Sequence, residues 1–260
     1  MSESLESLMQ AAAELAQLAG DAALRHYGTK LAVEAKTDGS PVTVADREAE
    51  RLARAWIERR FPADGIVGEE FGVSRPEAPR RWILDPIDGT KSFVRGVPLW
   101  GTLVAVAQGE EVLAGAACFP AVRESVAAAP GCGCWANGSR ARVSPVASLA
   151  GATVLVTDER FPLAPSRRER WGRLAREAAV SRTWGDCYGY LLVATGRADV
   201  MVDDVVSAWD AAALLPVITE AGGVFTDWRA RPTAFGGGAI ATNAALADEV
   251  RALLVERDDA

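Results

Sequence analysis

A short apolar run leads directly into two carboxylates in the segment Trp82-Ile83-Leu84-Asp85-Pro86-Ile87-Asp88-Gly89-Thr90-Lys91-Ser92. The apolar residues predict the end of a buried strand. Because Pro86 cannot donate to a strand ladder, we expect the backbone to turn there. Gly89 permits a close backbone approach, and Thr90 begins a polar stretch that can open a helix. The segment therefore predicts a tight turn that carries Asp85 and Asp88.

This turn has the composition of a metal and phosphate site. Two carboxylates three residues apart repel each other unless a cation lies between them, and hard divalent cations with oxygen ligands suit that position. If the amides of Gly89 and Thr90 open a helix, they offer an anion site beside the cation. A solvated acidic turn is the plain alternative. It would explain an isolated Asp-x-x-Asp pair better than it explains all eleven residues.

Composition and charge restrict the class of protein. The chain has 260 residues, of which 49% are hydrophobic and 24% charged, as in ordinary globular proteins large enough for one large domain or two halves. A net charge of −7 argues against nucleic acid and against anionic membranes as partners. No apolar run reaches membrane-spanning length, and the N-terminal residues lack a signal-peptide pattern. We expect a cytoplasmic protein.

The cysteines and the histidine predict neither a disulfide framework nor a zinc site. Four cysteines in a chain of this length, without regular spacing, are not typical of a disulfide scaffold. Cys132 and Cys134 form a Cys-x-Cys pair, but His26, the one histidine, is far away in sequence. His26 is expected in the last turn of the first helix, where a partial positive charge suits the helix dipole, so we expect it to be structural.

Two helices and an acidic pair are expected before the central segment. Residues 4–27 are rich in Ala and Leu at helical spacing, and a second amphipathic helix begins near Asp46. Taken alone, Asp46 is explained as an N-terminal cap or first-turn acid. Glu69 and Glu70 follow a short apolar strand. Because side chains alternate along a strand, we expect only one of the two to face a shared site, and a solvated strand end remains open for both.

An antiparallel sheet is expected after the central segment, and a second sheet after that. Strands over 99–108, 112–119 and 123–129 precede Asn137-Gly138, a strong two-residue hairpin signal. Gly131-x-Gly133 superficially resembles a nucleotide loop, but no strand and helix frame it. We expect residues 1–143 to hold the larger sheet and the metal motifs. Residues 144–260 would hold the smaller sheet and the substrate-side residues, both halves forming one domain.

Asp210 lies in the first turn of a long apolar helix expected over 206–221 and closed by Gly222-Gly223. A carboxylate is favourable beside the positive end of a helix dipole, so this position alone would explain the residue.

Four motifs in order resemble the inositol monophosphatase superfamily of magnesium-dependent, lithium-sensitive phosphatases. They are the Val-Thr-x-x-Asp segment ending at Asp46, Gly68-Glu69-Glu70, Asp85 to Thr90, and Trp209-Asp210 with Glu220-Ala221-Gly222-Gly223. No single motif is specific, but the four together are, and they cover nearly the whole chain. The resemblance implies an α+β fold, the five-layer αβαβα sandwich shared with fructose-bisphosphatase, with the site between two halves. It also implies a homodimer.

The resemblance implies a set of metal ligands. One Mg²⁺ ion would be held by Glu69, Asp85 and the carbonyl of Ile87. A second would be held by Asp85, Asp88 and Asp210. A third ion would be reached by Glu69 through water. Two metals of this kind stabilise both the entering and the leaving oxygen of a phosphate ester.

The resemblance also implies the catalytic roles. The phosphate would rest on the amides of Gly89 and Thr90. Asp46 would bind a metal or partner Thr90, and Thr90 with Asp46 would orient a metal-activated water for in-line attack. Glu69 would share in this catalysis as a ligand. No histidine base is needed.

The segment Trp184-Gly185-Asp186-Cys187-Tyr188-Gly189-Tyr190, with Ser92 to Thr102, resembles the histidinol-phosphate phosphatase branch. Asp186 stands where generic members have small neutral residues, so we expect it to bind the positive amine or imidazole of histidinol phosphate. A helix cap is the alternative for Asp186, and Tyr188 and Tyr190 could pack beside the imidazole or serve structure alone. Asp203 matches a position that often contacts the alcohol.

Two other functions stay open at this point. The first is an inositol-1-phosphatase. The second is a phosphate-binding regulator without catalysis, which the complete acidic set opposes. Bisphosphate substrates would require extra basic residues, and no such cluster is apparent.

Overall fold

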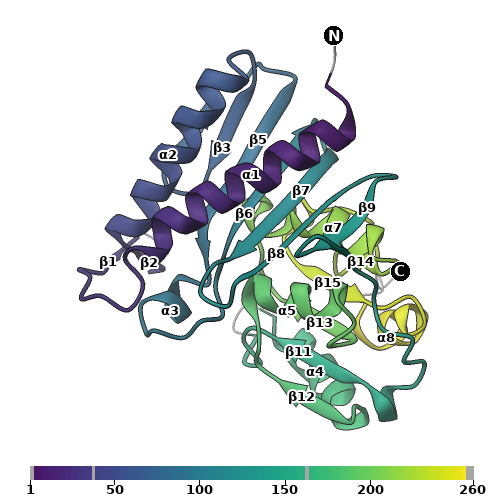
Figure 1. Ribbon diagram of the computed structural model, residues 1–260. Coiled ribbons are helices and arrows are strands. Elements are labelled where there is room, and N and C mark those ends of the chain that lie inside the picture. The colour runs from purple at the N-terminus through teal and green to yellow at the C-terminus, as the bar shows by residue number, and fades with distance from the viewer. Residues whose placement is uncertain (1–2, 37–38, 162–163, 256–260) are drawn as a thin grey trace.

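The protein folds into five alternating layers of helix and sheet (Figure 1). The computed structural model describes residues 3–36, 39–161 and 164–255. Helices α1 (Leu5–Leu24) and α2 (Val44–Arg60) cover the outer face of an eight-stranded sheet. Helices α5 (Asp186–Ala194), α6 (Ala208–Ala211) and α7 (Leu214–Glu220) lie between this sheet and a five-stranded one. Helices α4 (Pro165–Glu177) and α8 (Ala247–Leu254) cover the far face of the smaller sheet, which confirms the expected αβαβα sandwich.

The larger sheet has the strand order β10-β9-β8-β7-β6-β5-β3-β4 and is antiparallel except where β3 and β5 run parallel. Its strands are β3 (Gly65–Gly68), β4 (Gly72–Ser74), β5 (Arg80–Asp88), β6 (Gly101–Gln108), β7 (Glu111–Phe119), β8 (Glu124–Ala129), β9 (Gly133–Ala136) and β10 (Ser139–Arg140). Asn137 (φ 47°) and Gly138 (φ 76°) form the expected two-residue hairpin, since a tight hairpin turn of this kind needs positive φ at both positions.

Strand β5 does not end where the sequence predicts. It continues through Pro86 to Asp88, and its register against β6 shifts between Asp85 and Asp88. The Thr102 hydroxyl donates to the Pro86 carbonyl at 2.7 Å. The expectation of a turn at Pro86 was therefore wrong: the proline makes the strand irregular but does not end it. The irregularity lets two carboxylates leave the same strand end.

The smaller sheet has the order β12-β11-β13-β15-β14 and is mixed. Its strands are β11 (Thr153–Val156), β12 (Val180–Arg182), β13 (Val200–Asp203), β14 (Val224–Thr226) and β15 (Ala239–Thr242). Strands β12 and β13 both pair with β11 in parallel. The remaining elements are short: β1 (Glu34–Ala35), β2 (Pro41–Val42), α3 (Thr90–Phe93) and the 3₁₀ turn Leu149–Gly151. Of the loop between β1 and β2, Thr37 and Asp38 lie outside the described residues.

The long helix expected over 206–221 is two helices. Helix α6 ends at Ala211 and α7 begins at Leu214. Pro216 explains the break, because it has no N–H to donate to the carbonyl four residues earlier and its ring crowds that carbonyl. The short α6 presents Asp210 to the larger sheet, whereas α7 packs between the two sheets.

Glu220 joins α7 to the larger sheet. Its carboxylate accepts hydrogen bonds from the amide of Gly131 (2.9 Å), in the turn between β8 and β9, and from that of Gly133 (2.8 Å), the first residue of β9. The Gly-x-Gly loop of the sequence thus encloses a side chain of this protein.

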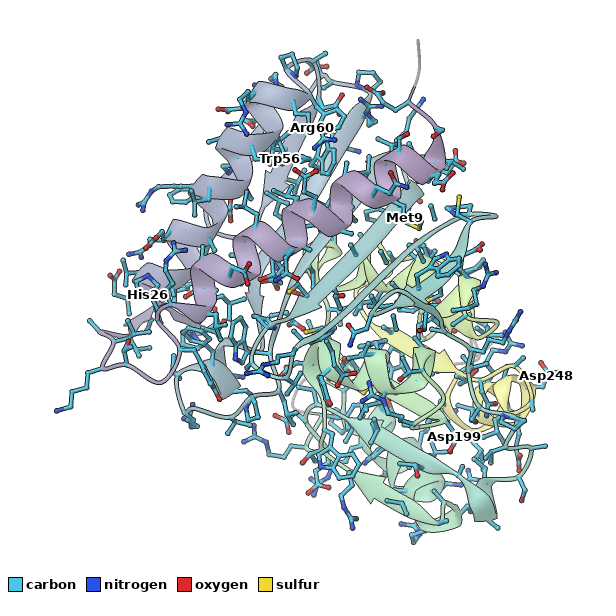
Figure 2. The ribbon with its side chains drawn as sticks, in the orientation of Figure 1. Met9, His26, Trp56, Arg60, Asp199 and Asp248 are labelled. Carbon is cyan, nitrogen blue, oxygen red and sulfur yellow. The ribbon has the colours of Figure 1, made fainter. Side chains whose placement is uncertain are left out.

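The histidine and the cysteines have structural positions. His26 lies just beyond α1, away from the smaller sheet (Figure 2), and its Nε2 is 2.8 Å from a Glu48 carboxylate oxygen. All four cysteines are free. Among the described residues, no helix combines the length and the apolar character needed to cross a membrane.

Candidate active site

Three carboxylates meet where β5 approaches α6. Oxygens of Asp85, Asp88 and Asp210 all lie within 4.8 Å of one another. Burial raises the pKa of Asp85 well above its usual range, and the carboxylates of Glu69, Asp88 and Asp210 raise it further. Burial also raises the pKa of Asp210, to about 6. Buried carboxylates this close together are costly unless a cation neutralises them, and an all-oxygen donor set fits a hard divalent cation.

Main-chain amides donate hydrogen bonds to each of the three. Asp85 accepts from the amide of Ile87, two residues on, at 2.9 Å. Asp88 accepts from the amide of Cys187, at the start of α5, at 2.5 Å. Asp210 accepts from the amide of Ser207 at 2.7 Å, in a capping box at the start of α6. Each bond fixes a carboxylate and leaves oxygen lone pairs available to a ligand.

Glu69 and Glu70 do not lie on a strand. Strand β3 ends at Gly68, and both glutamates lie in the turn that follows. Lys36 Nζ contacts both carboxylates, at 2.7 Å from Glu69 and 2.6 Å from Glu70. The expected strand alternation of the two glutamates was therefore wrong, because both lie in a turn, but Glu69 is the one that acts on the carboxyls of Asp85 and Asp210. Burial raises the pKa of Glu70 to about 7, although the Lys36 hydrogen bond lowers it.

Sequence reasoning missed Glu50, which holds this turn in place. Glu50 is fully buried, and its carboxylate accepts from the amides of Glu70 (2.7 Å) and Phe71 (3.2 Å). Gly68 is required here, since a Cβ at that position would overlap the Glu50 carboxylate. The available signal was spacing: Glu50 lies one helical turn after Asp46, on the same face of α2.

Thr90 lies two residues after Asp88, and Asp46 interacts electrostatically with Glu69. Asp46 is fully buried, and one carboxylate oxygen accepts from the amide (2.7 Å) and hydroxyl (2.6 Å) of Thr43 in a capping box. Its other oxygen is buried and has no hydrogen-bond partner among the described residues. The Thr90 hydroxyl donates to the carbonyl of Ile87 at 2.9 Å. Gly89 has a left-handed backbone (φ 84°), so α3 begins directly beside Asp88.

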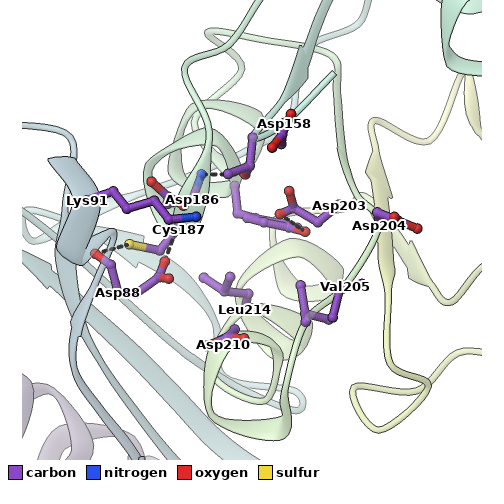
Figure 3. A pocket seen from close by; sticks show the side chains of 13 residues that line it. Asp88, Lys91, Asp158, Asp186, Cys187, Asp203, Asp204, Val205, Asp210 and Leu214 are labelled. Carbon is purple, nitrogen blue, oxygen red and sulfur yellow. Dashed lines mark hydrogen bonds between the residues drawn. The ribbon is translucent and has the colours of Figure 1, made fainter. Parts of the chain in front are cut away.

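A cavity of about 460 Å³ opens between the two sheets beside Asp88 and Asp210 (Figure 3). Its lining comes from both halves of the chain: Asp88, Lys91, Thr157, Asp158, Asp186, Cys187, Tyr190, Asp203, Asp204, Val205, Val206, Asp210 and Leu214. Acidic side chains dominate this lining, so the cavity favours cationic ligands.

Most of the acids on the far side of the cavity have protein partners. Asp158 pairs with Arg160, and Asp204 lies 2.8 Å from Arg167. Asp203 accepts from the Tyr190 hydroxyl at 2.9 Å, and burial raises the pKa of this carboxyl to about 8.

Asp186 is the exception. It is the first residue of α5, but its carboxylate does not cap the helix and makes no hydrogen bond to another described residue. Burial raises its pKa to about 6, against the effect of nearby Lys91. A Cβ built on Gly89 would lie 3.1 Å from Asp186 Oδ2, so this acid lies directly beside the Gly89 turn.

The two tyrosines of the same segment differ. Tyr190 lines the cavity and is buried. The Tyr188 hydroxyl instead donates to Glu124 at 3.2 Å, and the Arg197 guanidinium lies over its ring. Tyr188 is absent from the cavity lining, so its packing is structural.

A five-layer αβαβα sandwich with buried carboxylates at the junction of its sheets defines a class of metal-dependent phosphatases. The chain belongs to the inositol monophosphatase family, whose sequence profile matches residues 4–258. This confirms the expected superfamily and the expected reaction class, phosphoric monoester hydrolysis.

Individual relatives agree with this. The chain is 43% identical to a histidinol-phosphatase of Chlorobaculum parvum over 240 residues, which cover 92% of this chain and 93% of that protein. It is 40% identical to a histidinol-phosphatase of Mycobacterium tuberculosis, over 87% of this chain and 89% of that one. Among solved structures, an inositol monophosphatase from Zymomonas mobilis superimposes with a TM-score of 0.87 at 31% identity, covering 97% of this chain and 99% of its own.

Proposed function

We propose that the protein hydrolyses histidinol phosphate to histidinol and phosphate, with Mg²⁺ as cofactor. The observation that carries this proposal is Asp186, a carboxylate that has no hydrogen-bond partner within the described part of the chain and faces the cavity beside Gly89. In histidinol phosphate the ammonium group is two carbons from the ester oxygen. A substrate phosphate held at Gly89 would place that ammonium close to Asp186. The histidinol-phosphatase names of the two relatives support the same substrate.

Five groups of this chain would hold the metal. We assign Asp85, Asp88 and Asp210 from their mutual distances, and Glu69 from its electrostatic contact with Asp85. The carbonyl of Ile87 completes the set, because it belongs to the same irregular strand end. When bound, two or three Mg²⁺ ions neutralise the phosphate oxygens and lower the pKa of the attacking water.

The remaining groups position the phosphate and the water. The amides of Gly89 and Thr90 donate to no described backbone group and would hold the phosphate oxygens. The free buried oxygen of Asp46 and the hydroxyl of Thr90 would accept and orient the protons of the attacking water. Asp46 thus combines the capping role that its position predicts with a role in the site.

The alcohol side of the cavity, which is the part near Asp186 and Asp203 that would receive the alcohol moiety of the substrate, would bind a cationic group. Asp186 would accept a charge-assisted hydrogen bond from the substrate ammonium, and Asp203 would contribute a second acidic group through its Tyr190-bound carboxyl. The acidic lining disfavours a second phosphate group on the substrate.

Asp186→Asn assayed on histidinol phosphate and on an uncharged aryl phosphate tests this proposal. The kcat/KM of this variant for histidinol phosphate should fall about 10- to 150-fold, as expected for a lost hydrogen bond to a charged group. Its kcat/KM for the aryl phosphate should fall much less. Asp158→Asn is the matched control, because it removes one negative charge from the same cavity at a residue already paired with Arg160. Equal losses of kcat/KM for histidinol phosphate in Asp186→Asn and Asp158→Asn would show that Asp186 acts only as a distant charge. That result would contradict the proposal.

Inositol 1-phosphate is the alternative substrate, favoured by the likeness to the Zymomonas mobilis inositol monophosphatase. Faster turnover of inositol 1-phosphate than of histidinol phosphate by the wild-type enzyme would identify inositol 1-phosphate as the preferred substrate. A phosphate-binding regulator would turn over neither ester.

We further propose a cytoplasmic homodimer that binds neither nucleic acid nor membrane, in line with the net charge of −7. Residues 1–143 and 144–260 would be two halves of one domain, since each sheet lies within one of these ranges. Light scattering after gel filtration would measure the oligomeric state directly.

A further inference from the structure

Thr157 lies between the two acids that face the alcohol side of the cavity. It follows directly after strand β11 and lines the cavity. Its hydroxyl accepts a hydrogen bond of 2.7 Å from the main-chain amide of Asp186. A Cβ on Gly185 would overlap Thr157, so the start of α5 packs directly against this side chain.

The same hydroxyl acts on Asp203. Strands β11 and β13 are parallel with Val156 opposite Val202, which puts Thr157 and Asp203 next to each other at the carboxyl ends of the two strands. The neighbouring Thr157 side chain lowers the pKa of Asp203, against the effect of burial. A hydroxyl has one donor and two acceptor positions, so it can donate to Asp203 while it accepts from the Asp186 amide.

The backbone of Asp186 needs such support. Its φ of 51° lies in the left-handed region, which non-glycine residues adopt rarely and only where neighbouring groups hold them. Among the described residues, the Thr157 hydroxyl is the hydrogen-bond acceptor for the Asp186 amide. Loss of this acceptor would leave the amide unpaired and allow the Asp186 side chain to change direction.

We propose that Thr157 is a positioning residue that fixes the Asp186 and Asp203 carboxylates relative to each other, and so selects phosphate esters whose alcohol carries an amine close to the phosphate. This inference rests on the proposed function, because it supposes that Asp186 binds the substrate ammonium. Thr157 itself need not touch the substrate.

The test compares Thr157→Val, which keeps the shape and removes the hydroxyl, with Thr157→Ser, which keeps the hydroxyl. With Mg²⁺ at saturation, Thr157→Val should raise KM for histidinol phosphate about tenfold, as expected when about 1.4 kcal/mol of binding is lost. Its kcat should fall much less than its KM rises, and its ratio of kcat/KM for histidinol phosphate over an aryl phosphate should fall about tenfold. Thr157→Ser should recover most of this ratio.

Thr195→Val is the matched control. Thr195 follows the last residue of the same helix α5, and its hydroxyl donates to the carbonyl of Leu191 at 2.7 Å, outside the cavity lining. This variant loses the same chemical group at the other end of the helix and should keep the wild-type substrate ratio.

A double variant separates a positioning role from general damage. If Thr157 acts through Asp186, then Thr157→Val adds little to the loss that Asp186→Asn alone causes on histidinol phosphate. Binding of L-histidinol to the Mg²⁺-loaded enzyme, measured by calorimetry, gives a readout without turnover and should weaken about tenfold in Thr157→Val.

Two results would overturn the inference: equal losses on both esters in Thr157→Val, or additive losses in the double variant. A wild-type preference for inositol 1-phosphate over histidinol phosphate is a separate result. It would reject the proposed function before any variant is made.

Discussion

The main-chain amide of Cys187 donates a 2.5 Å hydrogen bond to the carboxylate of Asp88, although the two residues lie 99 positions apart in the sequence. Asp88 ends strand β5 of the larger sheet, and Cys187 is the second residue of helix α5, which packs against the smaller one. The bond joins the acidic cluster to the alcohol side of the cavity. Formation of the site therefore depends on correct docking of both parts of the chain.

Asp88→Asn should separate this structural bond from the chemistry. The asparagine carbonyl can still accept from the Cys187 amide, and one buried negative charge disappears, so we expect the metal-free variant to melt no lower than wild type. Activity should fall more than about 100-fold, the factor that corresponds to about 3 kcal/mol of lost charge stabilisation. Thermal denaturation and phosphate release measure the two effects. An Asp88→Asn enzyme with nearly normal turnover at high Mg²⁺ would reject Asp88 as a ligand.

The metal-free protein should become less stable as the pH rises from about 4 to about 8. Burial raises the pKa of Asp186 and of Asp210 to about 6 and that of Asp203 to about 8, from the ordinary value of 3.8. The folded state therefore binds more protons than the unfolded state in this range, and each tenfold difference in proton affinity between the two states is worth about 1.4 kcal/mol. Melting temperatures measured in the presence of a chelator should fall by several degrees across this range.

Mg²⁺ is the control for this pH dependence. Bound cations stabilise the ionised carboxylates, so the slope should flatten or reverse when Mg²⁺ is present in excess. A metal-free protein whose melting temperature rises steadily from pH 5 to pH 8 would show that these acids are not buried together.

Removal of Lys36 should make metal binding easier. In the structure Lys36 Nζ lies 2.7 Å from Glu69, so a cation at that carboxylate has to compete with the ammonium group. We expect Lys36→Met to lower the metal-free melting temperature and to reduce the Mg²⁺ concentration for half-maximal thermal stabilisation by about threefold or more, because a partly buried ion pair is worth on the order of 1 kcal/mol. Arg25→Met, which breaks an exposed pair with Glu48, is the control. A higher Mg²⁺ requirement in Lys36→Met would mean that Lys36 supports the metal site.

Glu50→Gln should damage the turn that carries Glu69. A glutamine oxygen cannot accept from both the Glu70 and Phe71 amides and from Arg54 as a carboxylate does. We expect a loss of about 1.5–3 kcal/mol in the free energy of unfolding and a higher Mg²⁺ requirement for activity. Urea denaturation of Glu50→Gln and of Glu58→Gln measures the first effect. Glu58 lies on the same helix, is exposed and meets Arg75 only at 4.0 Å, so its substitution should be nearly neutral.

The local part of the site could be predicted from the sequence. Asp85, Asp88 and Thr90 are close in sequence, and six residues with a proline and a glycine leave few ways to arrange them. Asp210 could be placed with them only through the resemblance, since its position in the first turn of a helix is unremarkable by itself.

Contacts between distant segments could not be predicted in the same way. Lys36 reaches Glu69 and Glu70 because a two-stranded hairpin brings it there, and no pattern near either glutamate indicates a lysine partner. The bond from Cys187 to Asp88 uses a main-chain amide, which every residue except proline possesses. The continuation of β5 through Pro86 depends on Thr102 in the neighbouring strand. In each case the group that makes the contact lies far along the sequence from the residue that it contacts.

The loop from Gly131 to Gly133 is a small anion receptor whose ligand, the Glu220 carboxylate, belongs to the same chain. An intramolecular ligand has a high effective concentration, so the loop is occupied whenever α7 is folded in its place. Movement of α7 away from the larger sheet would have to pull this carboxylate out of its receptor and leave two amides unpaired. Any opening of the cavity that admits substrate should therefore leave α7 attached to the larger sheet.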